Sequence, residues 1–144
     1  MASEGGITYD LVMDLTSDYH GKGFHIFMDN YYTSPTLFTS LWSVRMGATG
    51  TRKANRKGLP KKLKDVKVDR GNLMVMHKEN LMAAKYHDRK IVYLLSTVET
   101  ATMRDTGRER RGERLRKPNV VMEYDKYMGG VDRADQMLNY TPFP

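Results

Sequence analysis

The stretch FHIFMDNYYTSP, residues 24–35, carries the strongest fold signal in the chain. Residues 24–28 form an almost unbroken apolar run without polar alternation, which is typical of a short strand covered on both faces of a parallel or mixed sheet. Asp29 follows directly, and Ser34 with Pro35 forms a helix N-cap followed by proline at the first helical position. We therefore predict a buried strand that ends at a carboxylate, then a loop, then a helix.

Helical spacing also precedes this stretch. Apolar residues recur at three and four positions over residues 9–20, and Gly21 with Gly23 ends the pattern in the manner of a C-terminal cap. A short strand is predicted between Gly47 and Gly50. The order helix, strand, loop, helix, strand indicates an α/β sheet.

The composition changes after this second strand. Residues 53–70 are basic and poor in apolar residues, which predicts a loop or linker, and residues 104–117 are again charged and predicted to be mobile in isolation. Between them, two strand-like runs at residues 72–77 and 91–98, with residues 81–86 between them, predict a small antiparallel meander.

The last segment follows Pro118. Apolar residues at Val131, Ala134 and Leu138 predict a helix that is entered near residues 129–130. We therefore expect three parts. They are the first part of an α/β core (residues 1–52), a basic insertion domain with short strands (53–117) and a returning helix of the core (118–144).

The formal charge of +7 is concentrated in two stretches. Residues 51–70 hold nine lysines and arginines against two aspartates, and residues 101–120 hold seven against three acidic residues. Such local concentration favours a polyanion, and nucleic acid is the commonest one, although a solvated lysine-rich loop explains the same charge. The chain has no cysteine, which excludes disulfides and thiolate metal sites, and no apolar run long enough to span a membrane.

Three aspartates are the candidates for chemistry. Asp29 lies at the carboxyl end of the predicted strand, where open α/β sheets place their ligands, although aspartate also opens turns by bonding its own backbone. Asp132 and Asp135 would be neighbours on one helix face and could hold a hard cation such as Mg²⁺, or simply cap the helix. The four histidines have no zinc-like spacing. No phosphate- or dinucleotide-binding motif supports a metabolic α/β enzyme.

Three blocks together resemble the transposase domain of piggyBac-type DNA transposases and of the host genes derived from them. They are FMDNYYTSPTLFTSLW, GATGTRKANRKGLPK and YDKYMGGVDRADQM. The succession of DNYYTS and, about a hundred residues later, GGVDRADQ is highly specific, and the resemblance runs from about Leu11 to the C-terminus. It implies a partial ribonuclease H-like fold, a truncated mixed sheet with flanking helices interrupted by a small basic insertion domain.

The resemblance also implies a site and its partners. Asp29 matches the second catalytic carboxylate of the family, Asp132 the third, and Asp135 a further aspartate required for activity. Together they would bind Mg²⁺ or Mn²⁺ for DNA strand cleavage and transfer. DNA with transposon ends and TTAA-type targets is the implied partner, a homodimer is a candidate assembly of the full-length family, and the nucleus is the implied location. The basic residues expected to contact DNA are Arg52, Lys53, Arg56, Lys57, Lys61, Lys62 and Lys64.

The chain departs from the family pattern at its first catalytic aspartate. Only 28 residues precede Asp29, and Asp10, Asp14 and Asp18 fall in the helix just before it, too close to take that part. We therefore expect a fragment of a transposase catalytic domain that is inactive alone. The alternative is a non-catalytic, domesticated DNA-binding protein that acts through its basic insertion.

Overall fold

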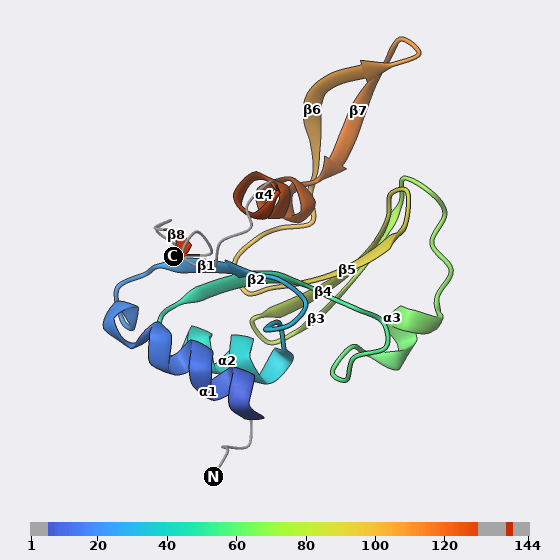
Figure 1. The fold of residues 1–144 in the computed structure, drawn as a ribbon. Coiled ribbons are helices and arrows are strands. Elements are labelled where there is room, and N and C mark those ends of the chain that lie inside the picture. The colour runs from blue at the N-terminus through green and yellow to red at the C-terminus, as the bar shows by residue number, and fades with distance from the viewer. Residues whose placement is uncertain (1–5, 130–137, 140–144) are drawn as a thin grey trace.

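The computed structural model describes residues 6–129 and 138–139. Its centre is a six-stranded mixed sheet with the strand order β3-β4-β5-β2-β1-β8 (Figure 1). The strands of this sheet are β1 (His25–Met28), β2 (Gly47–Arg52), β3 (Leu73–Lys78), β4 (Leu81–His87), β5 (Ile91–Ser96) and β8 (Leu138–Asn139). Strands β6 (Met103–Arg110) and β7 (Glu113–Pro118) form a separate hairpin. The helices are α1 (Gly6–Leu15), the 3₁₀ turn η1 (Ser17–Tyr19), α2 (Pro35–Ser43), α3 (Lys61–Asp65) and α4 (Asn119–Met128).

The unit predicted from residues 24–35 is confirmed. All four residues of β1 are buried, and β1 pairs in parallel with β2, with Ile26 opposite Ala48. Helix α2 connects the two strands and begins where expected, because the Ser34 hydroxyl accepts a hydrogen bond from the Leu37 N–H at 3.0 Å and Pro35 takes the first helical position.

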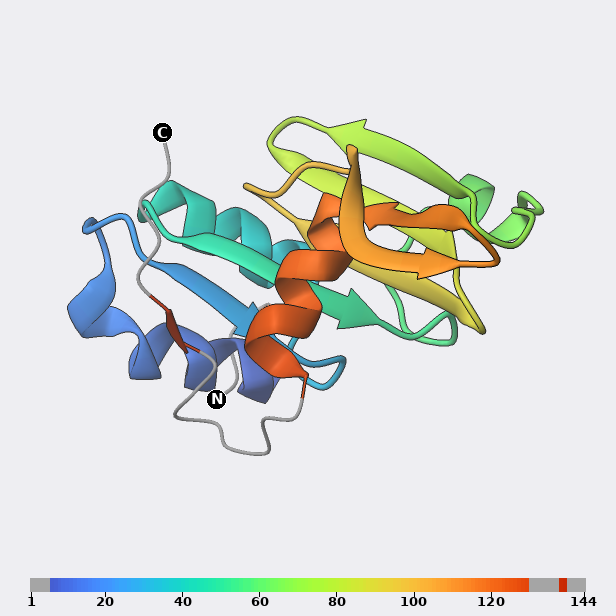
Figure 2. The ribbon, with the colours of Figure 1, turned by 90° about the horizontal axis from the view of Figure 1, so that it is seen from above.

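Helices cover both faces of the sheet, which explains why β1 lacks polar alternation. Helices α1 and α2 lie on one face and α4 on the other (Figures 1 and 2). The larger core, on the α1–α2 face, includes Ile26, Met28, Leu37, Phe38, Leu41, Met46 and Leu95. A smaller core joins α4 to β4 and β5 and consists of Met82, Ala84, Tyr86, Leu94, Val120 and Val121. Among the described residues, no helix has the length and hydropathy needed to cross a bilayer.

The middle of the chain is more ordered than the sequence predicts. Residues 53–70 contain α3, and Leu59, Leu63 and Val68 are buried, so this segment is not a plain linker. The predicted antiparallel meander is present as β3, β4 and β5. Strand β5 also pairs with β2, so the meander extends the sheet that contains β1. The boundaries of an insertion domain at residues 53 and 117 stay a prediction.

Two expectations for the C-terminal third need correction. The charged stretch 104–117 is not irregular but forms the β6–β7 hairpin, in which cross-strand charge pairs replace an apolar face. Helix α4 was not predicted, and it begins directly after Pro118, about ten residues before the expected one. The expected helix around Val131 and Ala134 lies outside the described residues, and Leu138, its last apolar position, belongs to β8.

Candidate functional site

The parallel pairing of β1 and β2 brings two loops to one edge of the sheet. Asp29 follows β1 and Lys53 follows β2, and the backbone N–H of Lys53 donates to the Asn30 side-chain oxygen at 2.7 Å. The Asp29 side chain is exposed, and its Oδ1 accepts from the Tyr31 N–H at 3.0 Å. Sequence reasoning therefore placed Asp29 correctly at a strand end, and its carboxylate keeps a second oxygen directed to solvent or ligand.

Two hydrogen bonds from Thr33 and the close approach of Gly50 fix the loop that carries Asp29. The Asp29 carbonyl accepts from both the N–H and the hydroxyl of Thr33, at 3.1 and 2.7 Å. Gly50 of β2 passes directly under this loop, since a Cβ at this position would lie 2.7 Å from the Met28 carbonyl oxygen and would collide with Thr33 Oγ1. Only glycine allows this close approach of the two strand ends.

Arg52 joins the two loops through its guanidinium. This side chain is buried and donates to the carbonyl oxygens of Thr33 and Lys57. Burial, with a further contribution from the charge of Arg56, lowers the pKa of Arg52. Among the predicted DNA-contacting residues, Arg52 therefore has a second role, because its donors hold the loop after β1 against the loop after β2.

The other predicted basic residues remain available to a ligand. Lys53, Lys57, Lys61 and Lys62 are exposed, while Arg56 and Lys64 are half-buried. In residues 6–129 the side chains of these six form no ion pair. A cavity of about 380 Å³ lies beside Asn30 and is lined by three cations, Arg52, Lys53 and Lys85. The site therefore combines one exposed carboxylate, that of Asp29, with a neighbouring cluster of lysine and arginine side chains.

Lys85 was missed by the sequence analysis because it lies inside an apolar strand. It is buried in β4 and donates to the carbonyl oxygens of Lys64 and Val66 at 2.8 and 2.5 Å. Its ammonium also lies 5.6 Å from the centre of the Tyr93 ring. Lys85 thus fixes the basic segment after α3 to the sheet.

Helix α4 places a further polar group at the same edge. The Tyr124 hydroxyl lies 3.2 Å from Thr51 Oγ1 at the end of β2. Burial raises the pKa of Tyr124, the hydrogen bond to Thr51 opposes this, and the negative charge of Asp29 adds to the increase. The sequence analysis did not identify Tyr124, because only the fold brings α4 to the end of β2.

The metal site expected from the resemblance is described only in part. Asp132 and Asp135 lie outside the described residues, although α4 ends at Met128, just before them in the chain. Within residues 6–129 and 138–139, no three histidine or acidic side chains come together as a metal-binding group. Of the three proposed ligands, Asp29 is the one within the described residues, and its exposed carboxylate has the hard oxygen atoms that such a metal prefers.

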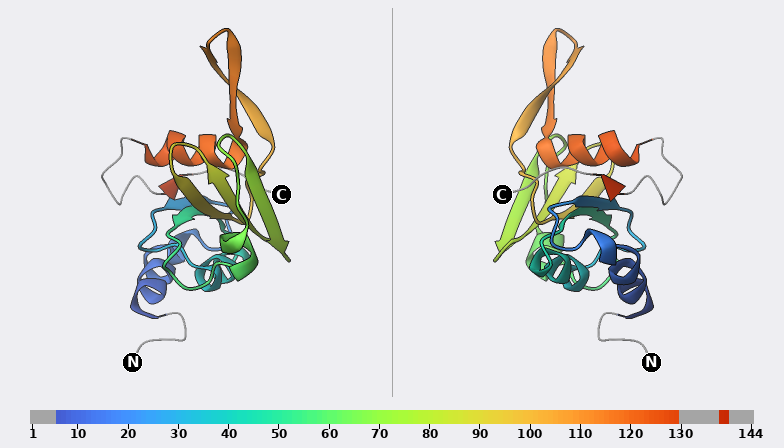
Figure 3. Two further views of the ribbon diagram at one scale, coloured as in Figure 1. Left: turned by 90° about the vertical axis from the view of Figure 1, so that its right-hand side faces the viewer. Right: turned by 90° about the vertical axis from the view of Figure 1, so that its left-hand side faces the viewer.

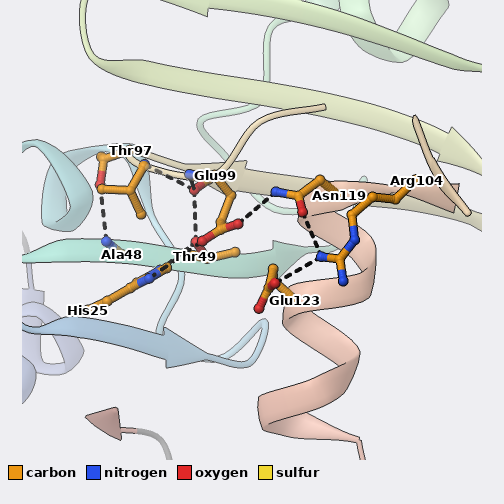
Figure 4. Close-up of polar contacts among 10 residues, drawn as sticks. His25, Ala48, Thr49, Thr97, Glu99, Arg104, Asn119 and Glu123 are labelled. Atoms are coloured by element: carbon orange, nitrogen blue, oxygen red, sulfur yellow. Dashed lines mark hydrogen bonds and ion pairs between the residues drawn. The ribbon is translucent and has the colours of Figure 1, made fainter. Parts of the chain in front are cut away.

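A hydrogen-bonded chain lies at the opposite end of β1 (Figure 4). The N–H groups of Val98 and Glu99 donate to Ser96 Oγ at 3.2 and 2.8 Å, so the Ser96 hydroxyl must donate to Thr49 Oγ1 at 2.8 Å. The Thr49 hydroxyl also lies 2.8 Å from His25 Nε2, with which it forms a hydrogen bond. The other ring nitrogen of His25, Nδ1, lies 3.7 Å from Glu99 Oε1.

This chain continues from Glu99 to α4. Glu99 accepts from the Asn119 amide at 2.9 Å, and Arg104 donates to Asn119 and Glu123 at 2.8 and 2.9 Å. Burial lowers the pKa of His25 to about 4, and burial together with the charge of Glu123 raises the pKa of Glu99. His25 is thus uncharged at neutral pH, and its contact with Glu99 is not an ion pair. The network anchors the start of α4 to β1, β2 and the segment after β5.

Comparisons with known proteins identify relatives for the whole of this fold. The family model described as "Transposase IS4" matches residues 2–143. The human piggyBac transposable element-derived protein 2 is 30% identical in an alignment of length 125 that covers 80% of this chain and 21% of that protein. The human piggyBac transposable element-derived protein 3 is 26% identical in a gapped alignment of length 152 that covers 94% of this chain and 25% of that protein.

A solved structure agrees with these sequence matches. The chain is 30% identical to the piggyBac transposase in a cryo-EM structure of a synaptic complex with hairpin DNA, with a TM-score of 0.70. The match covers 90% of this chain and 27% of that transposase. The chain therefore spans about a quarter of the length of the proteins that it matches.

Proposed function

Because this chain belongs to the transposase IS4 family as a piggyBac-type member, we propose that it is part of a catalytic domain for DNA strand cleavage and transfer. The observation that supports this most directly is the position of Asp29. Its carboxylate is exposed at the shared end of two parallel strands, beside a basic surround suited to phosphates. DNA is the proposed partner, with TTAA-type targets, a homodimeric full-length protein and a nuclear location as finer parts of the same proposal.

We propose Asp29, Asp132 and Asp135 as the ligands of Mg²⁺ or Mn²⁺ within a ribonuclease H-like fold. When bound, such metals activate the attacking water or 3′-hydroxyl and stabilise the leaving oxygen. The contribution of Asp29 is a carboxylate that the Thr33 and Tyr31 hydrogen bonds hold at a fixed place. We propose that residues 1–144 by themselves bind such a metal weakly and do not cleave DNA, because none of them matches the family's first catalytic carboxylate.

Paramagnetic relaxation of the amide signals by Mn²⁺ tests the metal site. We expect the signals around Asp29 to broaden in the wild type and to stay sharp in Asp29→Asn, because the substitution removes a charged ligand. Asp65→Asn is the matched control, since Asp65 is also exposed but lies at the end of α3. In Asp65→Asn the amide signals around Asp29 should broaden as they do in the wild type.

Equal broadening in Asp29→Asn and in the wild type would show that the metal binds elsewhere. A plasmid-nicking assay with the same three proteins tests catalysis separately. We expect no nicking, and Mg²⁺-dependent nicking that Asp29→Asn abolishes would overturn the proposed inactivity of the isolated chain.

A non-catalytic DNA-binding function is the second candidate. It is favoured by the exposure of Lys61 and Lys62 and by the lack of ion pairs among the basic residues of 53–64 in the described chain. If the basic segment binds DNA, neutralising three lysines (Lys61→Gln, Lys62→Gln and Lys64→Gln) should weaken binding and reduce the slope of log K against log salt by about 3. Asp29→Asn should leave the affinity unchanged. An unchanged salt slope in the triple variant would exclude this segment as the phosphate contact.

A further inference from the structure

The β6–β7 hairpin projects from the body of the molecule. It rises beyond α4, and its distal end projects away from the other labelled elements (Figures 1 and 3). Its two-residue turn consists of Arg111 and Gly112, both with positive φ (54° and 79°), which matches the turn type that continues the right-handed twist of two strands. A register shift between Asp105 and Glu109 adds a bulge.

The base of the hairpin is fixed to the rest of the protein. Arg104 binds Glu123 of α4 at 2.9 Å, and Lys117 lies 3.6 Å from Asp88 in the turn between β4 and β5. These two cations are therefore neutralised by the body of the protein. The hairpin leaves the body at a defined place, as Figure 4 shows for Arg104.

The distal half has a different charge balance. Arg114 pairs with Asp105 and Glu109 within the hairpin, at 3.0 and 3.7 Å. The side chains of Arg108 and Arg110 are exposed, and among the described residues they form no hydrogen bond or ion pair. Arg111 at the turn is exposed in the same way. Arg116 in β7 differs, because its charge acts on Asp105, and Glu113 lies opposite Arg110 in the register of the hairpin. The tip thus carries three exposed arginines, Arg108, Arg110 and Arg111, whose side chains form no ion pair among the described residues.

Packing does not explain this element. A two-stranded hairpin is marginally stable in water on its own, and repulsion between unpaired arginines weakens it further. Leu115 is one of few apolar residues along the hairpin and is half-buried. A projecting ribbon with this composition instead fits a partner that supplies dense negative charge from outside.

The dimensions of the hairpin select the class of partner. An eight-residue strand is about 25 Å long, and a two-stranded ribbon fits the major groove of B-form DNA, which is about 12 Å wide. The guanidinium fork binds guanine O6 and N7 in that groove and also binds phosphate oxygens. The deep, narrow major groove of an A-form RNA duplex excludes such a ribbon.

We propose that the β6–β7 hairpin inserts into the major groove of duplex DNA, with Arg108, Arg110 and Arg111 as its reading residues. This rests on the proposed function in that DNA is the substrate. The surface is separate from the basic segment 53–64. The hairpin is anchored on α4, whereas Leu63 of α3 packs into the core on the opposite face of the sheet.

Fluorescence anisotropy with a 20-base-pair DNA duplex tests the hairpin. We expect Arg108→Gln with Arg110→Gln to weaken binding at least roughly tenfold and to lower the salt slope by about 2. The matched control is Lys22→Gln with Lys78→Gln, which removes the same charge from two exposed positions and should change binding far less. The double variant Arg108→Gln with Arg110→Gln, called the hairpin pair below, should have the melting temperature of the wild type, because neither side chain forms a hydrogen bond or ion pair in the described chain.

A second experiment tests whether the hairpin binds in the major groove. Replacing guanine by 7-deazaguanine removes the N7 acceptor and leaves every phosphate in place, so it should weaken binding of the wild type and not of the hairpin pair. An RNA duplex of the same sequence should bind more weakly than the DNA. Equal binding of RNA, or insensitivity of the wild type to 7-deazaguanine, would overturn the major-groove placement.

The lysine variants of the basic segment separate this inference from the proposed function. If they weaken DNA binding and the hairpin pair binds like its Lys22 and Lys78 control, the hairpin inference is wrong while DNA remains the partner. If the wild type binds no duplex DNA at moderate salt, both fail together. If Arg108→Gln with Arg110→Gln loses DNA binding and the lysine variants keep it, the hairpin is the main DNA contact and the basic segment is not.

Discussion

Gly50 shows how a single residue supports the candidate site from outside it. The carboxylate of Asp29 is positioned by backbone and by Thr33, and both depend on the close passage of β2 under the loop. Arg52 has a comparable supporting role, because its buried guanidinium donates to backbone carbonyls in the loops after β1 and β2. Residues without any chemistry of their own thus determine where the carboxylate stands.

Gly50→Ala should therefore destabilise the fold and move the site. The added methyl group meets the Met28 carbonyl and Thr33 Oγ1, and such overpacking costs about 1–3 kcal/mol in the free energy of unfolding. Urea denaturation measures this cost, and the amide signals of residues 29–34 report the displacement of the loop. Gly112→Ala is the control for the loop signals alone, since alanine at its positive φ strains the hairpin turn. Its methyl group would meet nothing within 4 Å, so the signals of residues 29–34 should stay where they are. A native spectrum for Gly50→Ala would contradict the proposed close approach.

His25 gives a prediction about pH. Its pKa is lowered from 6.5 to about 4 in the folded chain, so between these values the unfolded chain binds more protons. The contribution of neutral His25 is fully present above pH 6.5 and is lost as the pH falls through 4, a decrease of about 3 kcal/mol in the free energy of unfolding. The raised pKa of Glu99 acts in the opposite direction, so the comparison must be made with a variant.

The variant for this comparison is His25→Gln, followed by urea denaturation at several pH values. The difference in stability between wild type and variant should shrink from pH 7 to pH 4. His77→Gln, at an exposed position, should follow the wild type at every pH. A constant difference between wild type and His25→Gln would show that protonation of His25 is not what weakens the fold.

At the scale of elements, α4 is held by polar contacts at its start and by apolar contacts along one face. Asn119 links Glu99 to Arg104, while Val120 and Val121 fill the smaller core. Asn119→Ala leaves the half-buried Glu99 carboxylate without its donor, at a cost of about 1–3 kcal/mol. Hydrogen exchange of α4 should accelerate more than that of α2. Asn55→Ala, in an exposed loop, should change neither, and unaltered protection of α4 in Asn119→Ala would refute this anchoring role.

Prediction from sequence succeeded where local chemistry decides the structure. The N-cap at Ser34, the apolar run of β1 and the carboxylate after it all have signals within a few residues. Prediction from sequence failed where contacts between residues far apart in the chain decide the structure. The β6–β7 hairpin has no apolar alternation. Its strands are joined by antiparallel pairing and by the contact of Arg104 with Glu123 of α4, which no local sequence signal predicts. For the candidate site, the sequence predicted the position of Asp29 at a strand end, and its catalytic role stays a prediction. Tyr124 and Lys85 had no such signal, because only the fold brings them to β2 and α3.

At the scale of the whole molecule, the shared sheet predicts cooperative unfolding. Strand β5 pairs with β2, so the meander and the first α/β unit lose their hydrogen bonds together. Trp42, the single tryptophan, lies in α2 and reports the first unit, whereas far-UV circular dichroism reports the whole chain. The two signals should give the same urea midpoint. Separate midpoints would favour an independent insertion domain between residues 53 and 117.

The turn of the β6–β7 hairpin has a consequence for how proteases meet this protein. Arg111 is exposed in the two-residue turn, so trypsin should cut the peptide bond after it before it reaches the buried chain. The cut would divide the chain into residues 1–111 and 112–144, which the packing of Val120 and Val121 on the sheet would keep together. A nicked but folded protein should therefore accumulate during brief digestion, and a ligand seated on the hairpin would be visible as protection of this one peptide bond.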